Sequence, residues 1–269
     1  MSENQFYTPA QVVDHSIQGQ VTKANLPLGK MLLLGILAGA FIAIGGTASS
    51  VAAHNITNVG VARTVAGAIF PVGLMLVILV GGELFTGNCL LIMAALDKKI
   101  TTLAVIRNLV LVYLSNFVGA FIIDLLVFYS GQFNYSNGGL GAYTIKVAIG
   151  KATISPVAGI TSGILCNILV CLAILMAAAA KDVNGKIWAI FFPILAFVVC
   201  GFEHCVANMF YIPAGLFSSY EYKIPRPKLN WGRFIYKNLI PVTLGNILGG
   251  MLFVGAICYA IHKTNWKKA

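Results

Sequence analysis

Long apolar stretches alternate with polar segments along most of this chain. A helix needs about 20 consecutive apolar residues to cross a bilayer. Regions that meet this requirement lie at roughly 30–53, 64–96, 105–130, 156–180, 187–217 and 235–262. The polar segments between them are short, except for 130–152 and 218–233. The pattern therefore predicts an all-α membrane protein with six transmembrane spans.

The second and fifth apolar regions are too long and too interrupted to be plain helices. Each starts with a Phe-Pro pair and carries a Gly-x-Glu inside its apolar run. The segments "GGELFTGN" (81–88) and "GFEHCVAN" (201–208) share the pattern G-x-E-x-x-x-x-N. We expect both helices to break there, because backbone can leave a helix within a bilayer only where protein or a cavity surrounds it. The free amides at each new helix start favour anions.

A second repeat supports a relationship between the two halves of the chain. Residues 108–119 and 238–249 match the pattern N-L-[VI]-x-V-x-L-x-N-[FI]-[VL]-G without a gap, and "GILAG" (35–39) weakly resembles "GILCN" (163–167). Three spans are thus followed by three similar spans. Since three is odd, the second copy must enter the membrane from the opposite side. Such an inverted 3+3 repeat is typical of transport proteins, whose substrate path lies between the repeats near mid-membrane.

The N-terminal segment precedes the first span and has a different character. Thr8 and Pro9 form a helix-start signal, with Thr8 as the N-cap and Pro9 in the first helical position. Val12, Val13 and Ile17 then begin an apolar stripe. We expect a short helix lying at the membrane surface.

The composition limits the possible functions. The chain is 58% hydrophobic and 10% charged, whereas a soluble domain has about 25% charged residues. The net charge of +10 lies in loops and termini, so contact with lipid headgroups or attraction of anions is expected rather than nucleic-acid binding. Neither a phosphate-binding loop nor zinc-ligand spacing among the cysteines is present in the sequence, and we expect no metal and no cofactor.

The acids at the two expected breaks allow two interpretations. Glu83 and Glu203 could transfer protons or coordinate ions, or they could bond neighbouring spans. Their equivalent repeat positions favour the architectural role. We assign this role to the polar residues at the breaks, which are Glu83, Asn88, Asn116, Glu203, Asn208 and Asn246.

His204 interrupts the internal symmetry, because Leu84 occupies the matching position of the first half. Histidine is the side chain that titrates near neutral pH, so this departure favours a functional role over a neutral core histidine. Lys151 precedes the fourth span, and its position fits either an ordinary interfacial lysine or a functional one.

Three segments carry a resemblance to a known family. They are "GGELFTGN" (81–88), "GILCNILVCLAI" (163–174) and "GFEHCVANMFYIP" (201–213). With these segments and the order of its six spans, the chain closely resembles the formate/nitrite transporter family, which has formate, nitrite and hydrosulfide members. The resemblance implies an aquaporin-like fold with inverted halves, assembled as a homopentamer with one pore per protomer.

The resemblance also implies roles for individual residues. His204 matches the family's central pore histidine, and Thr86 faces it. Lys151 and Asn167 match residues beside the pore. Apolar constrictions are expected at Phe70, Leu74, Leu84 and Phe197.

The chain is expected to have three parts. Residues 1–29 form the surface-helix segment, which resembles the family's gating helix. Residues 30–262 form the six-span channel domain, and residues 263–269 form a basic C-terminal tail.

The expected function is transport of small monovalent anions of weak acids, with formate the first choice and with coupling to protons. Nitrite and hydrosulfide remain alternatives, because the same pore chemistry serves them. A neutral-solute channel of the water or glycerol kind is a further alternative, although the sequence lacks paired Asn-Pro-Ala motifs.

An enzyme is not expected, since His204 has no nucleophile at recognisable spacing. We expect the cell membrane as the location, with both termini cytoplasmic.

Overall fold

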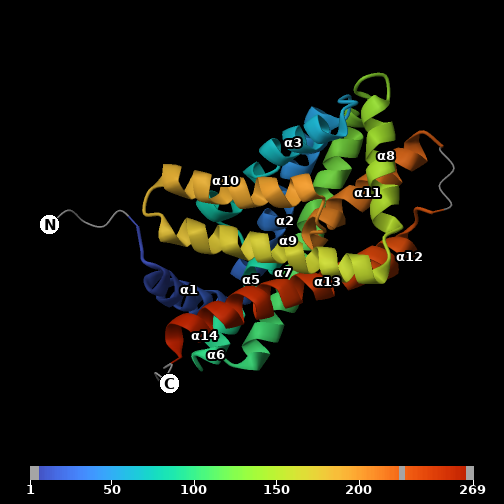
Figure 1. Cartoon of the computed structure of the whole chain (residues 1–269). Coiled ribbons are helices and arrows are strands. Elements are labelled where there is room, and N and C mark those ends of the chain that lie inside the picture. The colour runs from blue at the N-terminus through green and yellow to red at the C-terminus, as the bar shows by residue number, and fades with distance from the viewer. Residues whose placement is uncertain (1–5, 224–227, 265–269) are drawn as a thin grey trace.

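The computed structural model describes residues 6–223 and 228–264, and this part of the chain is built from helices (Figure 1). The elements of the first half are α1 (Pro9–Ala24), α2 (Leu28–Ala53), α3 (Val59–Ile69), α4 (Val72–Leu76), the π-helix η1 (Val77–Gly81), α5 (Phe85–Asn88), α6 (Leu91–Leu96) and α7 (Thr102–Tyr129). The elements of the second half are the short 3-10 helix η2 (Gln132–Asn134), α8 (Gly139–Ala152), α9 (Pro156–Ala179), α10 (Val183–Cys200), α11 (Cys205–Glu221), α12 (Trp231–Arg233), the π-helix η3 (Phe234–Leu239), α13 (Ile240–Ile247), the π-helix η4 (Leu248–Ala256) and α14 (Ile257–Lys263).

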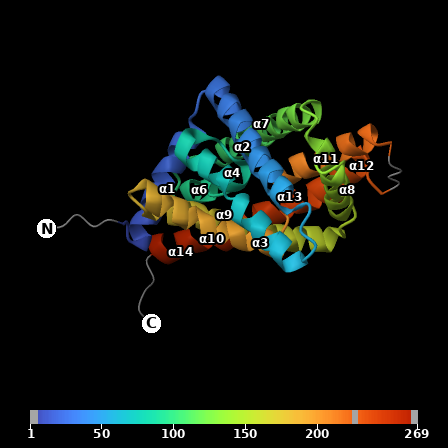
Figure 2. The same ribbon diagram turned by 90° about the horizontal axis from the view of Figure 1, so that it is seen from above.

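Among the described residues, six stretches of helix are long and apolar enough to cross a bilayer, which confirms the predicted six spans. They are Leu28–Ala53, Val59–Gly81, Thr102–Tyr129, Pro156–Ala179, Val183–Cys200 and Trp231–Lys263. Because this number is even, the chain enters the first span and leaves the last one on the same side. Accordingly α1 and α14 contact each other at one end of the molecule, while α8 and α12 lie at the other end (Figures 1 and 2).

Both predicted helix breaks are present, and a glycine begins each one. Gly81 has φ +109° at the end of η1, and Gly201 has φ +70° at the end of α10. Residues with a side chain avoid these values, so glycine lets the chain turn out of the helix. Extended residues follow, and new helices begin at α5 and α11. Pro193, in contrast, lies inside α10 without ending it.

The repeated segments 108–119 and 238–249 occupy equivalent places. The first lies on α7, which packs along α2, and the second runs through α13, which packs along α9. A Cβ atom added to Gly119 would overlap the carbonyl oxygen of Ile36, and one added to Gly249 would overlap that of Ile164. The glycines therefore permit the same close approach of backbones in both halves, as expected for helix packing in a membrane.

One polar segment between spans contains a helix that the apolar pattern did not reveal. Residues 139–152 form α8, which packs against α11 and buries Leu140, Ile145 and Ala148. The glycines of this segment lower its helix propensity, so it reads as a loop in the sequence. Tertiary packing supplies the stability that local propensity lacks.

The N-terminal helix begins as its sequence predicts. Thr8 caps α1, and Gln11 completes a reciprocal capping box with it. Val12, Val13 and Ile17 are buried in a cluster with residues of α6 and α9. The apolar stripe of α1 therefore packs on protein. Most of the expected basic tail lies outside the described residues, which end at residue 264.

Candidate functional site

The two helix breaks meet at a side-chain contact between the repeats. Thr86 Oγ1 on α5 lies 3.0 Å from Nε2 of His204, the residue that precedes α11. Both side chains are buried. The structure thus brings this sequence-predicted pair together at the junction of the two halves.

The hydrogen bonds of His204 fix its tautomer. The backbone N–H of Ala207 donates to Nδ1 at 3.0 Å, so His204 serves as the N-cap of α11. An Nδ1 atom that accepts a hydrogen bond carries no proton, and a neutral ring then carries its proton on Nε2. Nε2–H therefore donates to Thr86 Oγ1, and the hydroxyl hydrogen of Thr86 is left to be donated elsewhere.

Asn246 holds the extended segment in front of α11. Its Oδ1 accepts from the backbone N–H of Cys205 at 2.9 Å. Its Nδ2 donates to the carbonyl oxygens of Gly163 at 2.8 Å and Glu203 at 3.0 Å. One side chain thereby satisfies backbone groups that the break removes from the helical pattern, which is necessary where no water is available.

Asn116 does the same in the other half. Its Oδ1 accepts from the backbone N–H of Phe85 at 2.9 Å. Its Nδ2 donates to the carbonyl oxygens of Gly35 and Glu83, both at 2.8 Å. The two breaks are therefore held by equivalent bonds from equivalent residues.

Glu203 lies in a buried cluster with one cation and two amides. Lys151 Nζ lies 2.9 Å from Glu203 Oε1. Asn208 Nδ2 donates to Oε2 of Glu203 at 2.6 Å, and Asn238 Nδ2 donates to it at 3.1 Å. Asn238 also donates to the carbonyl oxygen of Lys151 at 3.0 Å, which ties α8 to the break. The carboxylate is charge-paired and hydrogen-bonded on both oxygens, as a buried acid requires.

Glu83 has a matching cluster in the other half. Lys23 Nζ lies 3.2 Å from Glu83 Oε1, and Asn88 Nδ2 donates to Oε2 at 2.7 Å. Asn88 also donates to Asn108 Oδ1 at 2.8 Å, and Asn108 donates to the carbonyl oxygen of Lys23 at 3.2 Å. The repeated unit therefore includes the helix that precedes each set of three spans, α1 in one half and α8 in the other.

Lys23, Asn108 and Asn238 were not among the predicted site residues, although a sequence signal for them exists. Asn108 and Asn238 open the repeated segments 108–119 and 238–249. Lys23 stands as many residues before the "GILAG" segment as Lys151 stands before "GILCN". Extension of the repeat toward the N-terminus would have revealed the lysine pair.

Asn167 lies between the two breaks. Its Nδ2 donates to the carbonyl oxygen of Thr86 at 3.2 Å and to that of Asn246 at 2.6 Å. Cys171 Sγ lies 3.7 Å from its Oδ1. Because its amide group bonds to the backbone of both halves, Asn167 joins the breaks and positions Thr86.

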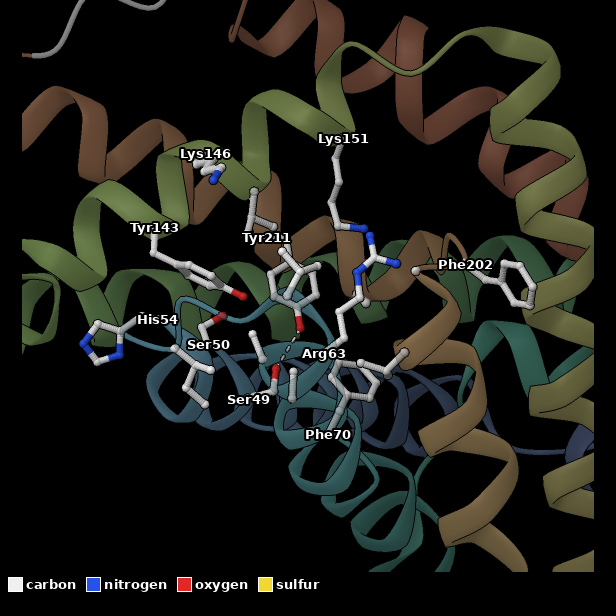
Figure 3. Close-up of a pocket in the computed structure, with 18 of the residues that line it drawn as sticks. Ser49, Ser50, His54, Arg63, Phe70, Tyr143, Lys146, Lys151, Phe202 and Tyr211 are labelled. Carbon is white, nitrogen blue, oxygen red and sulfur yellow. Dashed lines mark hydrogen bonds between the residues drawn. The ribbon is translucent and has the colours of Figure 1, made fainter.

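A cavity of about 650 Å³ leads to this junction from the side away from α1 and α14. Arg63, Lys146 and Lys151 lie along it, and Tyr143 and Tyr211 form part of its wall (Figure 3). The cavity is therefore cationic, and hydroxyl groups form part of its wall.

Aromatic rings close the inner end of the cavity. Phe70 and Phe197 meet edge to face with their centroids 5.5 Å apart, and Phe197 lies over the His204 ring at 6.0 Å. All three residues line the cavity. Leu74 and Leu84 are buried but do not line it. An ion that reaches the rings from the cavity thus meets an apolar barrier beside His204.

Comparisons with known proteins show what this chain is similar to. The sequence profile of the formate/nitrite transporter family matches residues 10–260. A probable formate transporter of Methanothermobacter thermautotrophicus is 40% identical over 94% of this chain and 96% of its own length. The formate channel FocA of Haemophilus influenzae is 38% identical over 96% of this chain and 95% of its own. A solved pentameric formate channel with formate bound superposes with a TM-score of 0.78 at 33% identity, covering 88% of this chain and 98% of that one.

Proposed function

This chain belongs to the formate/nitrite transporter family, and we propose that it carries formate across the cell membrane through a pore in each protomer. The observation that carries the proposal is the contact between Thr86 Oγ1 and His204 Nε2 at the inner end of a cationic cavity. Members of the family are transporters, not enzymes.

The barrier to transport is electrostatic. Moving a bare monovalent ion into a low-dielectric interior has an idealised cost of order 20 kcal/mol. Protonation of the anion removes most of this cost, and hydrogen bonds at the narrow point offset part of the remainder. Formate therefore waits in the cavity as an anion and passes the Phe70 and Phe197 rings together with a proton.

The residues at the junction of the two breaks have separate roles in transport. The Nε2–H of His204 is donated to Thr86 Oγ1, which leaves the Thr86 hydroxyl hydrogen for an oxygen of the passing molecule. The N-cap hydrogen bond holds His204 in place. Asn167 holds Thr86 in place, because its side-chain amide donates to the backbone carbonyl oxygen of Thr86. This arrangement supports a fixed donor at the place where the solute loses its water.

The environment of His204 supports coupling to protons. A second proton on the ring would have to sit on Nδ1, where the N–H of Ala207 already points. Forming the imidazolium ion would therefore break the N-cap hydrogen bond. The loss of a helix cap typically costs about 1 kcal/mol of stability, and burying the new charge costs more. Since a neutral ring offers the anion no stable countercharge, the transported species must bring its own proton.

Formate is the first choice among the possible solutes. Two of the relatives are named for formate, and the solved relative contains it. Nitrite and hydrosulfide are the alternatives, because both are small monovalent anions of weak acids. The cations along the cavity argue against a neutral-solute channel, because an uncharged solute does not need them.

Assembly and orientation extend the proposal. The solved relative is pentameric, and we propose a homopentamer for this chain. Leu114 and Leu126 on α7 are 57% and 61% exposed, so lipid or a neighbouring protomer must cover them. We place both termini in the cytoplasm, and the cavity then opens to the exterior.

Uptake of solute and of protons by proteoliposomes tests the function directly. Purified protein in proteoliposomes is supplied with formate, nitrite, hydrosulfide, lactate or chloride from pH 5 to pH 8. Because formate crosses the rings together with a proton, its transport carries no net charge, and the proposal predicts formate uptake that acidifies the vesicle interior and grows as the pH falls. Chloride, which has no protonated form in this range, should show little uptake. Osmotic swelling with glycerol in the absence of any formate uptake would contradict it.

A further inference from the structure

Lys151 contributes little net charge to the outer cavity. Its Nζ pairs with Glu203 Oε1 at 2.9 Å, and both side chains are largely buried. The same ammonium lies 5.4 Å from the centre of the Tyr211 ring. Because the carboxylate cancels most of the ammonium field at longer distances, this pair alone cannot draw an anion in from solution.

Two other cations, Arg63 and Lys146, line the same cavity. Arg63 projects from α3 and Lys146 from α8 (Figure 3). Within residues 6–223 and 228–264, neither side chain has a carboxylate within 4.0 Å, and no aspartate or glutamate lines the cavity. The net positive charge of the cavity therefore comes from Arg63 and Lys146.

Contacts with the end of α10 hold the Arg63 guanidinium in place. Its Nη1 donates to the carbonyl oxygen of Val199 at 3.3 Å. A Cβ atom added to Gly201 would lie 3.3 Å from the same nitrogen, so the group rests on the turn that starts the break. A guanidinium has five N–H donors, so this bond leaves others for a ligand.

We propose that Arg63, assisted by Lys146, forms an outer capture site for small monovalent carboxylates, upstream of the rings of Phe70 and Phe197. The inference rests on the proposed function and adds a separate binding step to it. A guanidinium fork matches the two oxygens of a carboxylate, and Lys146 adds a point charge. Both residues are solvent-exposed, so the site binds weakly and releases its ligand inward.

Charge-removing variants test the capture site in oriented proteoliposomes, with formate supplied from the cavity side. We expect Arg63→Gln with Lys146→Gln to raise the half-saturating formate concentration about threefold to tenfold. The maximum rate should stay near that of the unmodified protein, and raising the ionic strength should have less effect on the variant. Arg63→Lys keeps the positive charge but removes the planar guanidinium group, so it should give an intermediate half-saturating formate concentration.

The matched control is Lys30→Gln with Lys186→Gln, which removes two charges near the opposite end of the spans. It should leave the half-saturating concentration unchanged. If the Arg63 and Lys146 double variant keeps the half-saturating concentration and salt dependence of the unmodified protein, the capture site is overturned and the proposed function stands. Absence of formate flux in the unmodified protein would overturn both.

Discussion

Thr86 Oγ1 and His204 Nε2 lie 3.0 Å apart, although the two residues belong to opposite repeats. Each stands at the start of a new helix after a break, and an asparagine from a neighbouring span holds each break in place. The two side chains that meet at the junction therefore each belong to a helix break that hydrogen bonds hold rigid. This rigidity allows the Thr86 hydroxyl group to be presented in a fixed direction.

The aromatic barrier gives a prediction about size selectivity. Phe197 contacts both Phe70 and His204, so its truncation opens the inner end of the cavity. We expect Phe197→Ala to raise lactate flux about tenfold, which corresponds to a barrier lowered by about 1.4 kcal/mol. Formate flux should change much less. Equal lactate flux in variant and unmodified proteoliposomes would exclude Phe197 from the barrier.

The two lysine–glutamate pairs should differ in their contribution to stability. The Lys151 side chain is 17% exposed, whereas that of Lys23 is 31% exposed. Breaking a buried pair by removing one partner costs about 3 to 5 kcal/mol, and the cost falls as solvent reaches the remaining charge. We therefore expect Glu203→Gln to lower the midpoint of thermal unfolding in detergent more than Glu83→Gln does. An equal or reversed order would contradict this interpretation.

The close helix contacts give a prediction about packing. A methyl group at Gly119 or Gly249 would overlap a carbonyl oxygen of the adjacent helix. We expect Gly119→Ala and Gly249→Ala each to cost about 1 to 3 kcal/mol and to reduce the yield of folded protein. Gly150 is the matched control, because a Cβ atom there meets nothing within 4 Å. Gly150→Ala should be neutral or stabilising, as judged by size-exclusion chromatography and thermal unfolding.

Much of the fold follows from the sequence because hydrophobic length and repetition are local signals. The six spans and the two broken helices were predicted from apolar runs and from the Glu and Asn within them. The repeated segments 108–119 and 238–249 indicated that the two halves of the chain are inverted copies. The helix at 139–152 was missed, since its stability comes from packing on α11 rather than from its own residues.

The chemistry of the site was less accessible from the sequence. His204 stood out because Leu84 occupies its counterpart position, whereas the position of Lys151 alone did not reveal its partner. The distance to Glu203 turns an apparently free cation into half of an ion pair. Arg63 had no sequence signal, because its place on the cavity depends on the turn at Gly201. Which cations of the cavity are paired with a carboxylate and which are not depends on the folded structure, so the sequence alone does not show it.

The most direct test of the central claim is formate flux as a function of pH in His204 variants. His204→Ala removes the ring and the cap, and His204→Asn keeps a residue type that caps helices well. For the unmodified protein we predict flux that rises steeply as the pH falls, because the protonated solute becomes more abundant. Loss of the ring leaves space for a hydrated anion, so both variants should lose this dependence while retaining the oligomeric state of the unmodified protein in detergent. An unchanged pH profile in both variants would contradict the account.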